Sequence, residues 1–104
     1  MEEDKILDTN LLIRGERGLT TALNIVEYPQ GLSLASKVLW PERADFVTAI
    51  TAMRALKKIG MPIAAVDLLL CAIAFNRDLT LVTTDRRIAP VKAVLPELKL
   101  EIVK

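Results

Sequence analysis

Four carboxylates stand far apart in the sequence at positions where a fold could bring them together. Asp8 ends the apolar stretch KILD, Glu27 follows LTTAL, and Asp85 ends TLVTTD. Asp67 is the single charge in the apolar run AAVDLLLCAIAF, residues 64–75, where an unpaired charge is costly. Carboxylates that share a pocket repel one another unless a divalent cation neutralises them, and such oxygen ligands suit Mg²⁺ or Mn²⁺. The chemistry that follows is metal-assisted hydrolysis of a phosphodiester bond.

The composition excludes several other chemistries. The 104 residues include no histidine, so a His-based triad or a zinc site built on histidine is ruled out. The one cysteine, Cys71, lies in the apolar run; we expect a small buried side chain there and no internal disulfide. The chain has 14 basic and 13 acidic residues, so any basic surface for a nucleic acid must be gathered on one face.

Length and hydrophobicity indicate one small domain with a partner. We expect a single domain over residues 1–104, because this length supports one core. Hydrophobic residues make up 52% of the chain, so we expect a second copy or a regulatory peptide to cover apolar surface. The apolar stretches are shorter than the roughly 20 residues of a membrane-spanning helix, and the acidic start MEEDKILD lacks the pattern of a signal peptide. We therefore expect a cytoplasmic protein without membrane contact.

Predicted strands alternate with predicted helices, which is typical of an α/β fold with a small parallel sheet flanked by helices on both faces. The predicted strands cover residues 5–8, 19–23, 80–85 and 98–103. The predicted helices cover residues 24–29, 32–40, 41–60, 64–76 and 86–95, the last interrupted by Pro90. Ligands bind beyond the carboxyl ends of parallel strands, so this fold would gather the four acids at one edge. Only residues 9–18 join the first two strands, fewer than a parallel crossover normally needs.

Four segments together resemble the acidic motifs of PIN-domain ribonucleases. They are DTN at 8–10, NIVEY at 24–28, VDLLLCAIA at 66–74 and LVTTD at 81–85. The resemblance keeps the order of the family motifs, covers nearly the whole chain and is closest to short prokaryotic members such as VapC-type toxins. It implies a Rossmann-like sheet, an endoribonuclease that depends on Mg²⁺ or Mn²⁺ and acts on RNA, and frequent homodimers. For a toxin, it also implies a small antitoxin protein that occludes the site.

The resemblance also assigns roles to individual residues. The catalytic, metal-binding acids would be Asp8, Glu27, Asp67 and Asp85. Asn10 and Thr83 would be polar neighbours that orient a ligand or water. One departure is the span of 19 residues from Asp8 to Glu27, where the family typically inserts a full helix or two.

Each acid also has a plainer interpretation. Asp67 would cap a helix that begins at Leu68, and Asp8 would be an ordinary turn residue. Asp85 would cap the next helix or pair with a following arginine. Glu27 would be a solvated helix residue.

The cations and aromatic residues near these motifs leave two interpretations open. Arg86 and Arg87, directly after Asp85, would contact phosphate near the site or form a solvated basic turn, and Arg14 and Arg17 share this choice. Trp40 and Tyr28 would stack on bases or pack in a core or interface.

Two other functions compete with a nuclease. A catalytically degenerate PIN-like module would bind RNA or protein without cutting, and the short first connection favours it. A phospho-accepting receiver domain needs an acid at the end of a middle strand and a late lysine beside it. Here the third acid lies in a helix and Leu98 precedes the last strand, so the receiver ranks lower.

Overall fold

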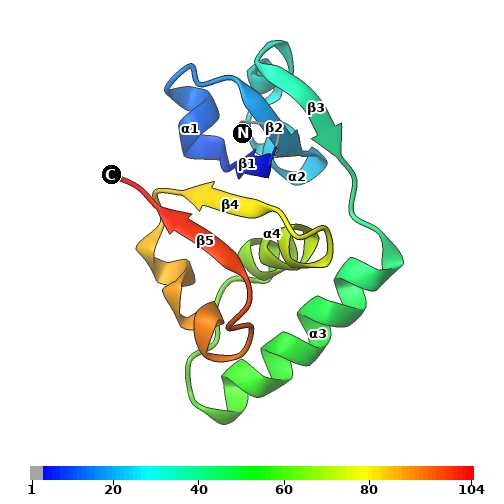
Figure 1. Cartoon of the computed structure of the whole chain (residues 1–104), viewed down its shortest axis with the longest axis vertical. Coiled ribbons are helices and arrows are strands. Elements are labelled where there is room, and N and C mark those ends of the chain that lie inside the picture. Colours follow the sequence, from blue (N-terminus) through cyan, green and yellow to red (C-terminus); the bar gives the residue numbers. More distant parts are fainter. Residues whose placement is uncertain (1–3) are drawn as a thin grey trace.

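A five-stranded sheet forms the centre of the computed structural model, which describes residues 4–104 (Figure 1). All four strand pairs are parallel and the order is β3-β2-β1-β4-β5. The strands are β1 (Lys5–Leu7), β2 (Gly18–Thr21), β3 (Ala35–Leu39), β4 (Thr80–Thr83) and β5 (Lys99–Ile102). The predicted α/β class with a parallel sheet is confirmed.

Helices cover both faces of this sheet. They are α1 (Thr9–Ile13), α2 (Ala22–Glu27), the 3-10 helix η2 (Pro29–Ser33), α3 (Arg43–Lys58), α4 (Ala65–Asn76) and the 3-10 helix η3 (Arg86–Ala93). Buried side chains of α3, α4 and η3 form one core with the sheet, and those of α1 form a second core on the other face. Helix α4 lies against β4, and α3 packs on α4 at the outside of the molecule (Figure 1).

Successive side chains in the central strands supply both cores. Ile6 of β1 pairs with Leu81 of β4 and both belong to the larger core, whereas the next pair, Leu7 and Val82, belongs to the smaller one. Neighbouring residues of a strand point to opposite faces, so a strand buried on both faces is apolar without alternation. This explains why KIL and LV are continuous apolar stretches that end in polar residues at the same edge.

Helix α4 is the buried helix that the apolar run predicts. All residues from 68 to 74 are buried, including Cys71 at its centre. Burial raises the pKa of the Cys71 thiol to about 12, so this side chain behaves as a small apolar residue and not as a nucleophile. No helix within residues 4–104 is long and apolar enough to span a membrane.

The predicted helix over residues 32–40 is wrong. Residues up to Ser33 belong to η2, and Ala35–Leu39 form the edge strand β3, which pairs in parallel with β2. Alanine, leucine and lysine favour a helix locally, but such propensities are weak compared with tertiary context. The backbone groups along the open edge of β2 need partners, and β3 supplies them.

The connection between β1 and β2 contains the short helix α1, which the sequence analysis did not predict. Asp8 caps its first turn, and Leu11 and Leu12 enter the smaller core. Gly15, with φ of +88°, turns the chain back towards β2, a conformation that glycine adopts without steric strain. Because β1 and β2 are adjacent in the sheet, one short helix is enough for the crossover.

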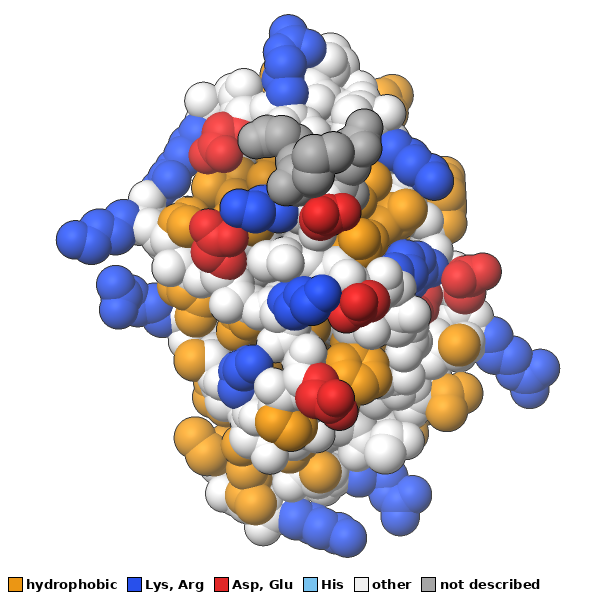
Figure 2. All heavy atoms as spheres, viewed as in Figure 1, with side chains coloured by type: hydrophobic (Ala, Val, Ile, Leu, Met, Phe, Trp, Pro, Cys, Tyr) orange, Lys and Arg blue, Asp and Glu red, His pale blue; other side chains and the backbone are white. Residues whose placement is uncertain are grey.

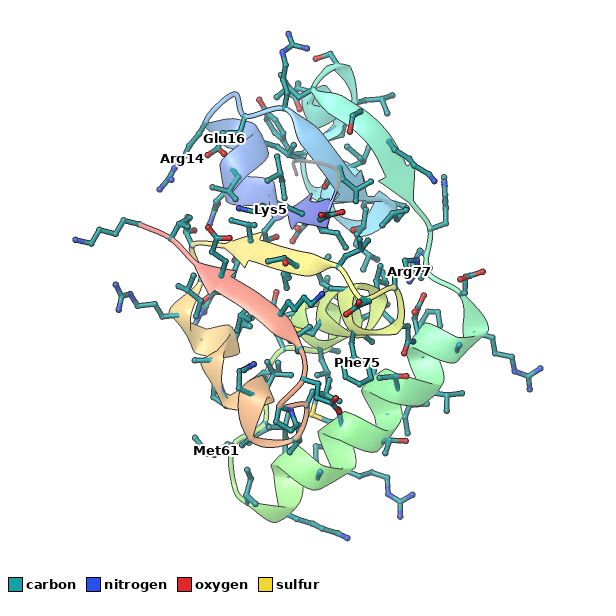
Figure 3. The ribbon with its side chains drawn as sticks, viewed as in Figure 1. Lys5, Arg14, Glu16, Met61, Phe75 and Arg77 are labelled. Atoms are coloured by element: carbon teal, nitrogen blue, oxygen red, sulfur yellow. The ribbon has the colours of Figure 1, made fainter. Side chains whose placement is uncertain are left out.

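A buried ion pair fixes α4 against the segment that leads from β3 into α3. The side chain of Asp45 is 1% exposed, and Nη1 of Arg77 donates to both of its oxygens at 3.0 and 3.2 Å. Nδ2 of Asn76 and the backbone N–H of Glu42 complete its hydrogen bonds. Burial raises the pKa of Asp45, but these hydrogen bonds, led by that of Arg77, lower it more, so the net pKa lies below its usual value. Arg77 also donates to the carbonyl of Trp40, and Figure 3 shows it beside this segment.

Candidate active site

Four carboxylates from distant parts of the chain line one pocket of about 360 Å³. Asp8 directly follows β1 and Asp85 follows β4, so both lie at the carboxyl edge of the sheet. Glu27 is the last residue of α2, and Asp67 lies in the first turn of α4. The remaining lining residues are Thr9, Asn10, Ala64, Val66 and Arg87.

Asp8 is buried and held by three donors. Its Oδ1 accepts from the backbone N–H of Thr9 at 2.8 Å and from Nδ2 of Asn24 at 2.9 Å, and its Oδ2 accepts from the Thr83 hydroxyl at 2.6 Å. Asp8 is therefore both the cap of α1 and a wall of the pocket. Thr83, at the end of β4, does not line the pocket and fixes the Asp8 carboxylate instead, so its predicted role of orienting a ligand or water stays a prediction.

Asn24 is a positioning residue that the sequence analysis did not single out. Its side chain is buried, donates to Asp8 and to the Thr9 hydroxyl at 3.0 Å, and accepts from the hydroxyls of Thr21 and Thr20 at 2.7 and 3.2 Å. A buried amide with its oxygen fixed by two hydroxyls presents its NH₂ group in one direction. The only signal in the sequence is a polar residue three positions before Glu27 in NIVEY.

Glu27 and Asn10 lie at the open side of the pocket. Oε1 of Glu27 accepts from the Thr9 hydroxyl at 2.6 Å, and Thr9 in turn accepts from Asn24. Nδ2 of Asn10 donates to the hydroxyl of Thr84 at 2.8 Å. Both side chains are exposed, so both can turn towards a bound ligand.

Asp67 differs from the other three acids in that no hydrogen bond from residues 4–104 stabilises its charged form. Its side chain is partly buried, so its pKa depends on burial and on the neighbouring charges. Burial raises its pKa most, and the charges of Asp8, Asp85 and Glu27 raise it further. The prediction that Asp67 caps a helix starting at Leu68 is wrong, because α4 begins at Ala65 and its cap is Ala64. An acid in the first turn still interacts favourably with the helix dipole.

Asp85 is paired with Arg87. The backbone N–H and Nε of Arg87 donate to Oδ1 at 2.9 and 3.0 Å, and its Nη2 donates to Oδ2 at 2.9 Å. These hydrogen bonds lower the pKa of Asp85. Of the two arginines predicted as candidate phosphate contacts, Arg87 lines the pocket, whereas Arg86 is exposed and does not.

The other candidate cations lie away from the acids. Arg14 donates to the carbonyl of Lys104 and Arg17 to that of Ser33. Both line a different pocket of about 250 Å³ together with Lys5 and Glu16; Lys5, Arg14 and Glu16 are labelled in Figure 3. On the face seen in Figure 2, Lys and Arg alternate with Asp and Glu, so the described residues form no continuous basic patch there.

The two aromatic residues near the motifs have different environments. Tyr28 packs against the smaller core, whereas Trp40, which follows β3, is 71% exposed. Neither lines the pocket of acids.

The donor set of the pocket fits a hard divalent cation in chemistry. Four carboxylates with hydroxyl and amide oxygens beside them are the ligands that Mg²⁺ and Mn²⁺ take. As the side chains stand, no group of three or more acidic side chains within residues 4–104 is close enough together to hold one ion. Asp8 is hydrogen-bonded to Thr83, Glu27 to Thr9 and Asp85 to Arg87. Binding of one ion by three of the acids therefore requires a rearrangement in the pocket, and Glu27 is the acid whose side chain is exposed and can turn.

Comparisons with known proteins agree on the fold. No family model and no curated protein matches the sequence. Among solved structures, a chain of DNA-bound VapBC from Salmonella typhimurium has a TM-score of 0.75 at 16% identity, covering 96% of this chain and 98% of that one. A chain of VapBC-5 from Mycobacterium tuberculosis, described as a member of a family of toxin-antitoxin systems, has a TM-score of 0.71 at 19% identity, covering 96% and 99%. A chain of FitAcB from Neisseria gonorrhoeae has a TM-score of 0.70 at 16% identity, covering 93% and 96%. The sheet and its covering helices are thus those of a known fold over nearly all of the chain.

Proposed function

We propose that this protein is an endoribonuclease that depends on Mg²⁺ or Mn²⁺ and hydrolyses RNA phosphodiester bonds. The observation that carries the proposal is that four acidic side chains from distant parts of the chain line one pocket. Four acids share it, and one of them, Asp67, has a pKa raised by burial and by the other three. A divalent cation bound among these acids would relieve the repulsion.

Each acid of the pocket and each residue behind it has its own proposed role. Asp8, Asp67 and Asp85 would hold the ion, and Glu27 would complete the set. When bound, the ion supplies a water of lowered pKa and polarises the phosphoryl oxygen of the substrate. Asn24 and Thr83 keep the Asp8 carboxylate in one orientation, so its position costs no rearrangement during the reaction.

The pocket also provides groups for the substrate. Asn10 lies at the exposed side, where its amide can donate to a phosphate or base once it leaves Thr84. Arg87 carries the positive charge nearest to Asp85. Both are suited to the negatively charged backbone of an RNA strand, because phosphate contacts position a nucleic acid without reading its sequence.

We infer two protein partners. Chains of the same fold belong to VapBC and FitAcB complexes, so we propose that this protein is the toxin of a toxin–antitoxin pair. A basic side chain of an antitoxin would offset the repulsion among the acids that metal otherwise relieves. We also propose that the protein acts in the cytoplasm and that it forms a homodimer. The dimer is supported by α3, where the apolar side chains of Phe46, Val47 and Ile50 are 50, 57 and 61% exposed.

Cleavage of RNA by matched variants tests this function. We expect the natural protein to cut RNA with Mg²⁺ or Mn²⁺ and to stop when EDTA is added. Asp67→Asn should abolish cleavage while its circular dichroism stays native. Asp78→Asn makes the same chemical change at an exposed residue that pairs with Lys99 outside the pocket, and it should keep full activity. Cleavage that survives Asp67→Asn would rule out this site.

The second candidate is a PIN-like module that binds RNA or protein without cutting. It is favoured by the present arrangement of the acids in residues 4–104, where no three of them lie close enough together to hold one ion. A thermal melt separates the two functions, because a ligand that binds the folded state raises its stability. Millimolar Mn²⁺ should raise the melting temperature of a nuclease and leave that of a degenerate module unchanged.

A further inference from the structure

Arg87 makes the closest ion pair at the pocket of acids. Its guanidinium forms two parallel hydrogen bonds to Asp85, Nε to Oδ1 at 3.0 Å and Nη2 to Oδ2 at 2.9 Å. The backbone N–H of the same residue also donates to Oδ1. Both carboxylate oxygens are therefore engaged, and a metal ion that used Asp85 would compete with the guanidinium for them.

Arg87 is also the only cation that lines this pocket among the described residues. Four acids line the same pocket, so its formal charge is three negative when all are ionised. Asp85 raises the pKa of Arg87 most, by their hydrogen bonds, and Asp67 adds to the effect from across the pocket. The guanidinium thus lies where a divalent cation would otherwise bind these acids.

The two partners of the Arg87–Asp85 ion pair differ in exposure, so the arginine can move away from the aspartate. The side chain of Arg87 is 88% exposed, while that of Asp85 is 18% exposed. The arginine can swing into water without losing solvation, and an exposed ion pair contributes little to stability. The backbone N–H of residue 87 also donates to the carboxylate, and this hydrogen bond does not depend on the guanidinium.

We propose that Arg87 is an internal counter-ion that a divalent cation must displace from Asp85, and that it thereby sets the metal affinity of the site. The inference rests on the proposed function, because it assumes that Asp85 is a ligand. In the absence of metal, Arg87 partly neutralises the acids. When metal is present, Asp85 is released and the guanidinium is free at the mouth of the pocket.

Calorimetric titration of the full chain with Mn²⁺ alone, at fixed ionic strength, tests this inference. Arg87→Gln removes the positive charge and the two parallel hydrogen bonds of the guanidinium to Asp85. The dissociation constant for Mn²⁺ should therefore fall by about two- to five-fold, as expected for the loss of one exposed competing ion pair. Arg86→Gln is the matched control, because it removes the same charge one residue away from a side chain outside the pocket lining. Arg87→Lys keeps the positive charge but cannot form both parallel hydrogen bonds, so its dissociation constant for Mn²⁺ should lie between those of the natural protein and Arg87→Gln.

The outcomes separate this inference from the proposed function. Tighter binding in Arg87→Gln than in Arg86→Gln supports the role of Arg87. Equal or weaker binding in Arg87→Gln, with clear binding by the natural protein, overturns that role and leaves the metal site intact. If neither the natural protein nor any variant binds Mn²⁺, the proposed metal site fails and the inference fails with it.

Discussion

Replacing Arg77 with alanine tests the part of the fold that holds the acid-bearing helix in place. Arg77 is the C-cap residue directly after α4, whose first turn carries Asp67. It ties this helix to the first turn of α3 through Asp45 and to the segment before α3 through the Trp40 carbonyl (Figure 3). The substitution removes the cation and leaves the Asp45 carboxylate buried with only the Asn76 amide and the backbone N–H of Glu42 as donors.

The expected loss of stability is large for a chain of this size. Breaking a buried ion pair by removing one partner costs about 3–5 kcal/mol. The side chain of Arg77 is 21% exposed, so water can reach the vacated space and the cost should lie near the lower limit, about 3 kcal/mol. For a small domain, this corresponds to a drop in melting temperature on the order of 15 °C.

Urea denaturation followed by circular dichroism measures this loss. Arg87→Ala is the internal comparison, because it removes an arginine that also donates to both oxygens of an aspartate, Asp85, but from an 88% exposed position. We expect Arg77→Ala to shift the denaturation midpoint strongly and Arg87→Ala hardly at all. Equal midpoints for the two variants would refute the reasoning that burial decides the energetic value of an ion pair here.

Three further predictions follow from the described contacts. Asp67→Asn should stabilise the metal-free protein at neutral pH, because it removes a partly buried charge whose pKa is raised by burial and three acids; a lower urea midpoint in EDTA would contradict this. The pKa of Asp45 is lowered in the folded state, so its contribution to stability is present above the usual value near 3.8 and is lost as the pH falls through the folded value. Urea midpoints across that range should fall more steeply for the natural protein than for Asp45→Asn. Ile50→Glu, on the exposed side of α3, should convert a dimer into a monomer in light scattering without unfolding it, whereas an unchanged mass would place the dimer contact elsewhere.

The sequence was informative where one local pattern determines the structure. The apolar stretches before Asp8 and Asp85 predicted strands, and parallel strands bring their carboxyl ends to one edge whatever the loops do. The apolar run around Asp67 predicted a buried helix, since a helix of that length without a polar face must be covered on most sides.

The errors lie where tertiary contacts decide. The strand state of Ala35–Leu39 depends on the open edge of β2, which no local pattern in ASKVL reveals. The sequence also left Arg86 and Arg87 equivalent. That only Arg87 of the two lines the pocket depends on the turn that begins η3, where Asp85 accepts from the backbone N–H of Arg87 and so brings that side chain alongside. The role of Asn24 depends on four partners, which come from β2, from α1 and from the turn after β1.

Soaking crystals of the protein in Mn²⁺ and recording anomalous diffraction tests the central claim most directly. The account predicts an anomalous peak in the pocket with oxygen ligands from Asp67 and at least one of Asp8 and Asp85, and with the Arg87 guanidinium turned away from Asp85. An empty pocket at saturating Mn²⁺, with Asp67 still unliganded, would contradict it.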